Sequence, residues 1–185
     1  MNKILKKNIL ITGATSGLGR ELSIHFNNRA EKLVCAGKNY LKIKSLKKKL
    51  ENNKNLYFNG DLSNNKKLKK FLLFLNKIKK IDTVIHCMGG GFGIKEDLIS
   101  EKNFLKLLKL NLICQSEINN FLIKRMIRQK ITGNILHVSS VAALESTASI
   151  GYSSAKAALT AYSKKLAKAF IKKNIFIKTI IPGAF

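Results

Sequence analysis

The sequence "ILITGATSGLG", residues 9–19, changes character twice within a short span. It begins with apolar and β-branched residues, which are typical of a buried strand. Three glycines with the spacing GxxxGxG follow at Gly13, Gly17 and Gly19. Gly13 would permit a tight turn, Gly17 the close approach of a pyrophosphate, and Gly19 close packing of a helix on a sheet. Strand, glycine turn and helix in this order predict a dinucleotide site at a helix N-terminus.

The rest of the chain alternates short β-branched runs with longer amphipathic segments. The predicted strands are residues 8–12, 32–36, 55–59, 83–87, 134–139 and 176–181. The predicted helices are residues 17–28, 40–52, 66–77, 101–129 and 151–172. This alternation indicates an α/β fold with a parallel sheet covered on both faces. Six strands match a Rossmann-type doubly wound sheet of order 3-2-1-4-5-6, here in one domain over residues 1–185.

The composition indicates a globular protein with one core. Of 185 residues, 45% are hydrophobic, but no apolar stretch is long enough to cross a bilayer. The apolar run near the N-terminus is too short for a signal peptide, so we expect a cytoplasmic protein without a membrane partner. The three cysteines form no CxxC pair and the three histidines do not cluster with them, so reduced buried thiols and no metal site are expected.

The formal net charge of +25 raises the possibility of a nucleic-acid surface. Nearly all of the basic residues are lysines, and they are spread from end to end. This distribution indicates a general lysine bias rather than a patch, so we expect no specific nucleic-acid partner and only weak adhesion to polyanions.

The second predicted strand ends in "LVCAGKN", residues 33–39. A carboxylate near this point would bind the ribose 2′-hydroxyl of NAD, whereas a basic residue would accommodate a 2′-phosphate. The sequence has Lys38 and no acid here. It therefore favours NADP, with NAD as the alternative.

A tyrosine and a lysine lie four residues apart at the start of the last predicted helix. Tyr152 and Lys156 therefore share one helix face. A free tyrosine is a poor acid–base group at neutral pH, and a nearby cation favours its phenolate form. Ser139 and Ser140 end the preceding strand, where a hydroxyl could bind a substrate carbonyl.

With these motifs in order, the chain resembles the short-chain dehydrogenase/reductase family over its full length. The matching stretches are "TGATSGLG" (12–19), "GDLS" (60–63), "KLNL" (109–112), "HVSS" (137–140), "YSSAK" (152–156) and "IIPG" (180–183). The resemblance implies an NAD(P)-dependent oxidoreductase that interconverts a carbonyl and an alcohol by hydride transfer.

The resemblance also implies roles for individual residues. Tyr152 would be the general acid/base, Lys156 would lower its pKa and bind the ribose, Ser140 would orient the carbonyl, and Asn111 would hold a relay water. The implied cofactor-binding residues are Gly13, Thr15, Ser16, Gly17, Leu18, Gly19, Lys38, Asp61, Leu62, Gly89, Tyr152, Lys156, Pro182 and Gly183. The helices at 101–129 and 151–172 would form a homodimer or homotetramer interface.

Two features depart from the family pattern. "HCMGGGFG", residues 86–93, has His86, Cys87 and Met88 where the family has Asn-Asn-Ala, which leaves open how that strand end is braced. The family also continues past Pro-Gly into further helices and a seventh strand, whereas this sequence stops at Phe185. We therefore expect a fragment or a truncated gene.

Two other functions compete with that of an active oxidoreductase. The first is a catalytically inactive remnant that only binds nucleotide, and the weaker one is a polyanion-binding protein.

Overall fold

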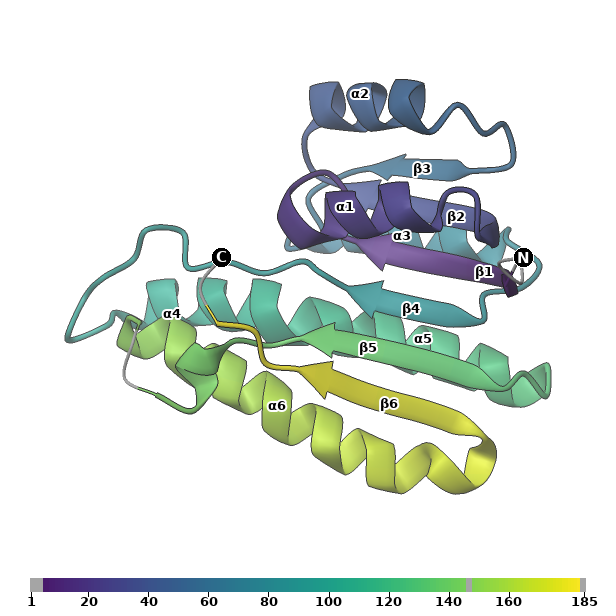
Figure 1. The fold of residues 1–185 in the computed structure, drawn as a ribbon. Coiled ribbons are helices and arrows are strands. Elements are labelled where there is room, and N and C mark those ends of the chain that lie inside the picture. Colours follow the sequence, from purple (N-terminus) through teal and green to yellow (C-terminus); the bar gives the residue numbers. More distant parts are fainter. Residues whose placement is uncertain (1–4, 146–147, 184–185) are drawn as a thin grey trace.

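The computed structural model describes residues 5–145 and 148–183. Its six parallel strands form one sheet in the order β3-β2-β1-β4-β5-β6 (Figure 1). The strands are β1 (Leu5–Thr12), β2 (Ala30–Gly37), β3 (Leu56–Asn59), β4 (Thr83–His86), β5 (Gly133–Val138) and β6 (Ile175–Ile180). The predicted doubly wound order is therefore confirmed. The order reverses between β1 and β4, and parallel sheets bind ligands at such a switch point, at the carboxyl ends of the strands.

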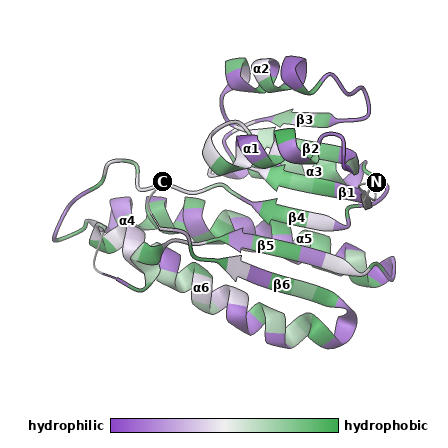
Figure 2. Ribbon diagram, viewed as in Figure 1, coloured by the Kyte–Doolittle hydropathy of each residue, from purple (hydrophilic) through white to green (hydrophobic). Residues whose placement is uncertain are grey.

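Helices cover the sheet in two layers. The helices are α1 (Gly17–Phe26), α2 (Tyr40–Leu50), α3 (Asn65–Asn76), α4 (Glu101–Leu108), α5 (Cys114–Arg128) and α6 (Ile150–Phe170). Side chains of α1 and α2 pack on one face of the sheet, and those of α3, α5 and α6 pack on the other. Figure 2 shows β1 hydrophobic in the part toward its carboxyl end and the helices mixed, as expected for a central strand between half-buried helices.

Burial alternates along β6, the last strand of the sheet. Ile175 and Ile177 are buried, whereas Phe176, Lys178 and Ile180 are exposed. The buried pair joins the core beneath α5 and α6. Among the described residues, no element covers the opposite side of this strand.

The helix predicted over residues 101–129 is present as a continuous helical segment over residues 101–128, but it is not α-helical throughout. A π-helical turn, η1 (Lys109–Ile113), separates α4 from α5, and the N–H of Cys114 donates to the carbonyl oxygen of Lys109. The sequence contains no glycine or proline here that would signal an interruption. Asn111, inside this turn, binds the backbone of Gly90 through its side chain, so the turn coincides with a tertiary contact.

Two further features of the fold concern membrane-spanning helices and clusters of metal-ligating side chains. Within residues 5–145 and 148–183, no helix is both long enough and apolar enough to span a membrane. Over the same residues, His, Cys, Asp and Glu side chains form no group of three that could hold a metal ion.

Candidate cofactor and active site

The glycine turn connects the carboxyl end of β1 to α1. Gly13 has φ of 72°, and a Cβ there would lie 2.7 Å from the backbone nitrogen of Met88. A Cβ on Gly19 would collide with the carbonyl oxygen of Gly13. Only glycine therefore allows β1, the loop after β4 and the start of α1 to approach this closely.

The N-terminus of α1 has the features of an anion site. Ser16 is the N-cap residue, but its side chain makes no capping hydrogen bond. A Cβ on Gly17 would meet no atom within 4 Å, so the space beside the first turn is open. Uncapped N–H groups and the positive end of the helix dipole suit a phosphate. These residues therefore fit the pyrophosphate of a dinucleotide.

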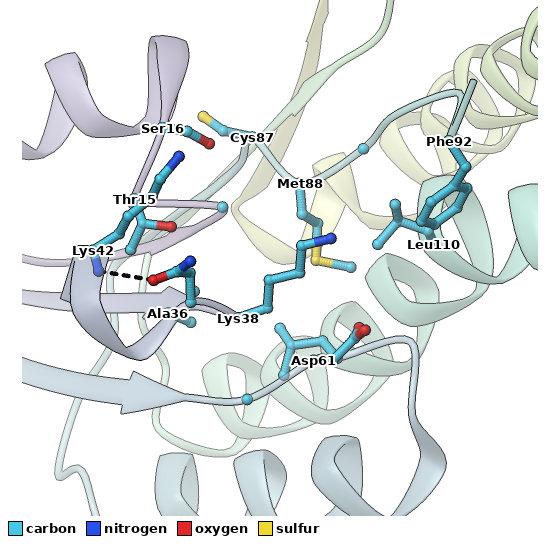
Figure 3. A pocket seen from close by; sticks show the side chains of 16 residues that line it. Thr15, Ser16, Ala36, Lys38, Lys42, Asp61, Cys87, Met88, Phe92 and Leu110 are labelled. Carbon is cyan, nitrogen blue, oxygen red and sulfur yellow. Dashed lines mark hydrogen bonds between the residues drawn. The ribbon is translucent and has the colours of Figure 1, made fainter.

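A first cavity of about 230 Å³ lies between the ends of β1, β2, β3 and β4 (Figure 3). Seven of the predicted cofactor residues line it: Gly13, Thr15, Ser16, Lys38, Asp61, Leu62 and Gly89. Asn39, Lys42, Met88, Phe92 and Leu110 also line it and were not predicted. Lys42 lies in the first turn of α2 and is exposed, and only the fold shows that it also lines the cavity.

A second cavity of about 610 Å³ lies beside the ends of β4, β5 and β6. It is lined by the predicted residues Leu18, Gly89, Ser140, Tyr152, Lys156, Pro182 and Gly183. Cys87 and Gly89 line both cavities. The two cavities therefore adjoin at the loop after β4, which suits a ligand with two halves.

Lys156 is almost fully buried beneath the second cavity. Its Nζ donates to the carbonyl oxygen of Val138 at 2.8 Å and lies 5.7 Å from the centre of the Tyr152 ring. Burial lowers the pKa of Lys156 from 10.5 to about 8. The predicted tyrosine–lysine pair is therefore brought together on one face of α6, with the lysine held by a strand end.

Gly89 makes room for two of the predicted catalytic side chains. A Cβ there would lie 2.8 Å from Oδ1 of Asn111 and 3.0 Å from Nζ of Lys156. A larger residue here would therefore have to displace these side chains, even with no ligand bound.

Asn111 lies behind the site and lines neither cavity. Its Oδ1 accepts from the N–H of Gly90, and its Nδ2 donates to the carbonyl oxygens of Gly90 and Leu107. Its own carbonyl oxygen accepts from Nε2 of Gln115. Asn111 therefore clamps the glycine-rich loop, and its role with a relay water stays a prediction.

The two adjacent serines have different environments. Ser139 is buried, and its hydroxyl bonds the carbonyl oxygen of Lys156 at 3.1 Å and Oγ1 of Thr160 at 2.8 Å. Ser140 faces the second cavity, and its Oγ accepts from the N–H of Ala142 at 3.2 Å. Both serines line the second cavity, but the hydroxyl of Ser139 is already bonded to Lys156 and Thr160, which favours Ser140 as the partner of a substrate carbonyl.

A buried histidine network braces the strand ends where the family has its asparagine pair. His86 bonds Oγ1 of Thr12 through Nδ1 and Oδ1 of Asn119 through Nε2. Nδ2 of Asn119 donates to Nε2 of His137, whose Nδ1 bonds Oγ of Ser163. The two imidazole rings stack with their centres 5.2 Å apart. The network joins β1, β4 and β5 to α5 and α6, which answers how the departure at His86 is accommodated.

Neutral imidazoles suit this network. If Nε2–H of His86 donates to Asn119, Nδ1 is free to accept from the Thr12 hydroxyl. His137 can likewise accept from Asn119 through Nε2 and donate to Ser163 through Nδ1–H. Burial lowers the pKa of His86 to about 4 and that of His137 to about 2. Both rings are therefore uncharged at neutral pH.

Fold and site together define a dinucleotide-binding α/β protein with a tyrosine–lysine pair at the strand ends. The profile of the short chain dehydrogenase family matches residues 7–185. The chain belongs to this family, and its class is oxidoreductase.

Individual relatives agree with this assignment. The chain is 29% identical to a 3-oxoacyl-[acyl-carrier-protein] reductase of Buchnera aphidicola subsp. Schizaphis graminum, with 98% of this chain and 74% of the relative aligned. A short-chain dehydrogenase from Sphingobium yanoikuyae in complex with NADPH matches with a TM-score of 0.87 and 20% identity, over 96% of this chain and 71% of that one. A 7α-hydroxysteroid dehydrogenase complexed with NADH and 7-oxo glycochenodeoxycholic acid matches with a TM-score of 0.87 and 26% identity, over 98% and 72%.

Proposed function

We propose that this protein interconverts a carbonyl and an alcohol with NADP as its preferred cofactor. The observation that carries the proposal is the pair of adjoining cavities with the uncapped start of α1 beside them. One cavity suits the adenosine half of a dinucleotide, and the other holds Tyr152, Lys156 and Ser140.

Charge in the first cavity supports NADP over NAD. Lys38 follows β2 and Lys42 lies in the first turn of α2, and both line the cavity. Among the described lining residues the only acid is Asp61, whose Oδ1 already accepts from the N–H and hydroxyl of Ser63. Two ammonium groups would attract a 2′-phosphate. Several similar solved structures contain NADPH, and another contains NADH.

The residues of the second cavity support an acid–base mechanism. Tyr152 would give a proton to the carbonyl oxygen during reduction and take it back during oxidation. Lys156 would place a positive charge beside the phenol and bind a ribose hydroxyl, while Ser140 would donate to the carbonyl oxygen. The bound cofactor would supply or accept the hydride.

For the substrate we propose a 3-oxoacyl thioester. The support is that several curated relatives, including those of Buchnera aphidicola and Rickettsia prowazekii, are 3-oxoacyl-[acyl-carrier-protein] reductases. The open second cavity would admit the β-carbonyl of a flexible chain.

Replacing Tyr152 tests the chemistry. Tyr152→Phe should reduce turnover of a 3-oxoacyl thioester by about 10²–10⁴-fold while NADPH binding stays within a factor of two or so, because the phenol serves only proton transfer. Tyr162→Phe, the same change later in α6, is the control. Wild-type protein that binds NADPH but reduces no member of a ketone panel would support the nucleotide-binding remnant instead. Equal turnover by Tyr152→Phe and wild type would overturn the mechanism.

We also propose self-association through α4, α5 and α6. Leu105, Ile113 and Ile127 are exposed apolar side chains on α4, η1 and α5, and a two-fold contact would cover them. Sedimentation at micromolar concentration should give at least a dimer, whereas a monomer would contradict this.

A further inference from the structure

Phe92 has an unusual backbone conformation at the edge of the first cavity. Its φ is 56°, in the left-handed region that a bulky residue rarely adopts. It follows three glycines, and Gly93 after it has φ of 72°. Such conformations persist where the surrounding structure holds the residue in place.

Two ammonium groups hold the ring of Phe92. Nζ of Lys106, on α4, lies 4.5 Å from the ring centre, and Nζ of Lys38 lies 6.0 Å from it. Cations at such distances are attracted to the face of an aromatic ring. The residue is 39% exposed, so it does not serve to fill the core. The loop and the lysines instead present the ring to the cavity.

The cavity has two chemically different ends. Phe92 and Leu110 lie together at one end, with Met88 beside them, while Thr15, Ser16 and Lys42 lie at the other (Figure 3). Lys38 extends from the polar side toward Met88. A ligand that fits both ends has a flat apolar ring joined to an anionic group.

We propose that Phe92 binds the adenine ring of the cofactor by stacking, with Lys106 holding the aromatic ring in position. The proposal rests on the proposed function, because the adenine belongs to the cofactor inferred there. Stacking of a base on an aromatic side chain is worth about 1–3 kcal/mol, which corresponds to roughly 5- to 150-fold in affinity.

The test uses fragments that separate the two halves of the cofactor. Adenosine 2′,5′-bisphosphate contains the base and the 2′-phosphate, and nicotinamide mononucleotide contains neither. Phe92→Ala should weaken binding of the bisphosphate within the range above and leave the mononucleotide unchanged, as measured by calorimetry. Leu98→Ala is the control, because Leu98 lies in the same connection, is almost fully exposed and does not line the cavity.

A second variant gives a direct spectroscopic readout. The chain contains no tryptophan, so Phe92→Trp introduces a single reporter at this position. Adenosine 2′,5′-bisphosphate should quench its emission, and nicotinamide mononucleotide should not. Lys106→Met should weaken bisphosphate binding several-fold, because the ring loses its cationic support.

The outcomes separate this inference from the proposed function. If wild type binds the bisphosphate but Phe92→Ala binds it equally well, or the indole emission of Phe92→Trp does not respond, the stacking role is wrong and the cofactor assignment stands. If wild-type protein binds neither NADPH nor the bisphosphate, the proposed function and this inference both fail.

Discussion

The Nζ atom of Lys156 lies 2.8 Å from the carbonyl oxygen of Val138, and the lysine is only 3% exposed to solvent. No carboxylate pairs with it in the part of the chain that the structure describes. The site therefore maintains a buried positive charge with one carbonyl oxygen as its hydrogen-bond partner. Such an arrangement lowers stability and is retained where function needs the charge.

Lys156→Met should therefore stabilise the protein while removing its function. The pKa of Lys156 falls from 10.5 to about 8 on folding, which corresponds to roughly 3 kcal/mol of unfavourable free energy at neutral pH. Loss of the bond to Val138 offsets about 1 kcal/mol. We expect the free energy of unfolding at pH 7 to rise by about 1–2 kcal/mol and NADPH binding to weaken, measured by denaturation and titration.

The pH dependence of the stability of the wild-type protein tests this explanation, because the lowered pKa of Lys156 determines its direction. Below pH 8 Lys156 is charged in both the folded and the unfolded state, so the full unfavourable free energy of burying its charge applies. Between about pH 8 and 10.5 the folded state releases its proton first, so stability should rise with pH through this window and the variant should lack that rise. A variant less stable than wild type at pH 7 would mean that the buried ammonium is net stabilising.

Substitution of Ser140 should mainly affect catalysis, whereas substitution of Ser139 should mainly affect stability. Ser140→Ala should lower kcat by about 10²–10³-fold, because it removes the donor to the substrate oxygen. Ser139→Ala should cost about 1–2 kcal/mol of stability, because it removes the hydroxyl that bonds Lys156 and Thr160. Steady-state kinetics and urea denaturation of both variants measure the two effects. The reverse pattern would assign the catalytic hydroxyl to Ser139.

Gly89→Ala should disturb the site without any ligand present. Its new Cβ would lie within 3.0 Å of both Asn111 and Lys156, and relief of that overlap should cost about 1–3 kcal/mol. Gly91→Ala is the matched control, because a Cβ there would meet nothing closer than 3.9 Å. Thermal unfolding of the two variants measures the difference, and equal stability would show that the loop relaxes freely.

The histidine network should make the protein sensitive to acid. His86 and His137 have folded-state pKa values lowered to about 4 and about 2, against 6.5 for a free histidine. Protons therefore bind the unfolded state first as the pH falls below 6.5, and stability is lost. Between pH 6.5 and 5 the two groups together should remove roughly 3–4 kcal/mol.

His86→Asn tests this by placing the amide of the family pattern at the same position. It should reduce the loss of stability between pH 6.5 and 5 by about half, since one of the two titrating groups is removed. His25→Asn, the same change at an exposed histidine, is the control. An unchanged acid slope in His86→Asn, measured by urea denaturation at several pH values, would exclude His86 as its source.

Lys38→Asp should reverse the cofactor preference. Wild type should bind NADPH more tightly than NADH, and the variant should prefer NADH by about tenfold or more, because the carboxylate repels a 2′-phosphate and accepts from a 2′-hydroxyl. Lys44→Asp makes the same charge change at an exposed position of α2 outside the cavity. Fluorescence titration of NADPH and NADH against wild type and both variants measures the preference. Tighter NADH binding by wild type would contradict the assignment of Lys38.

Much of the fold could be predicted because its signals are local. The alternation of β-branched runs with amphipathic segments depends on side-chain periods of 2.0 and 3.6, which are visible in the sequence. Right-handed crossovers then restrict the strand order, and the observed order agrees. The glycine turn, the strand-end serines and the Tyr152–Lys156 pair were also predicted, because each motif adjoins the end of a strand or the start of a helix.

The sequence by itself therefore determined the doubly wound sheet and most of the residues at its carboxyl edge. Only the tertiary structure decided the π-helical turn at Asn111, the burial of Ser139 behind Ser140, the bonding of His86 through Asn119 to His137, and the position of Phe92 beside Lys38 and Lys106. Each of these depends on contacts between residues far apart in the chain. A local pattern specifies the period of an element, but a hydrogen bond or ring contact across elements exists only once packing has set their distance and orientation.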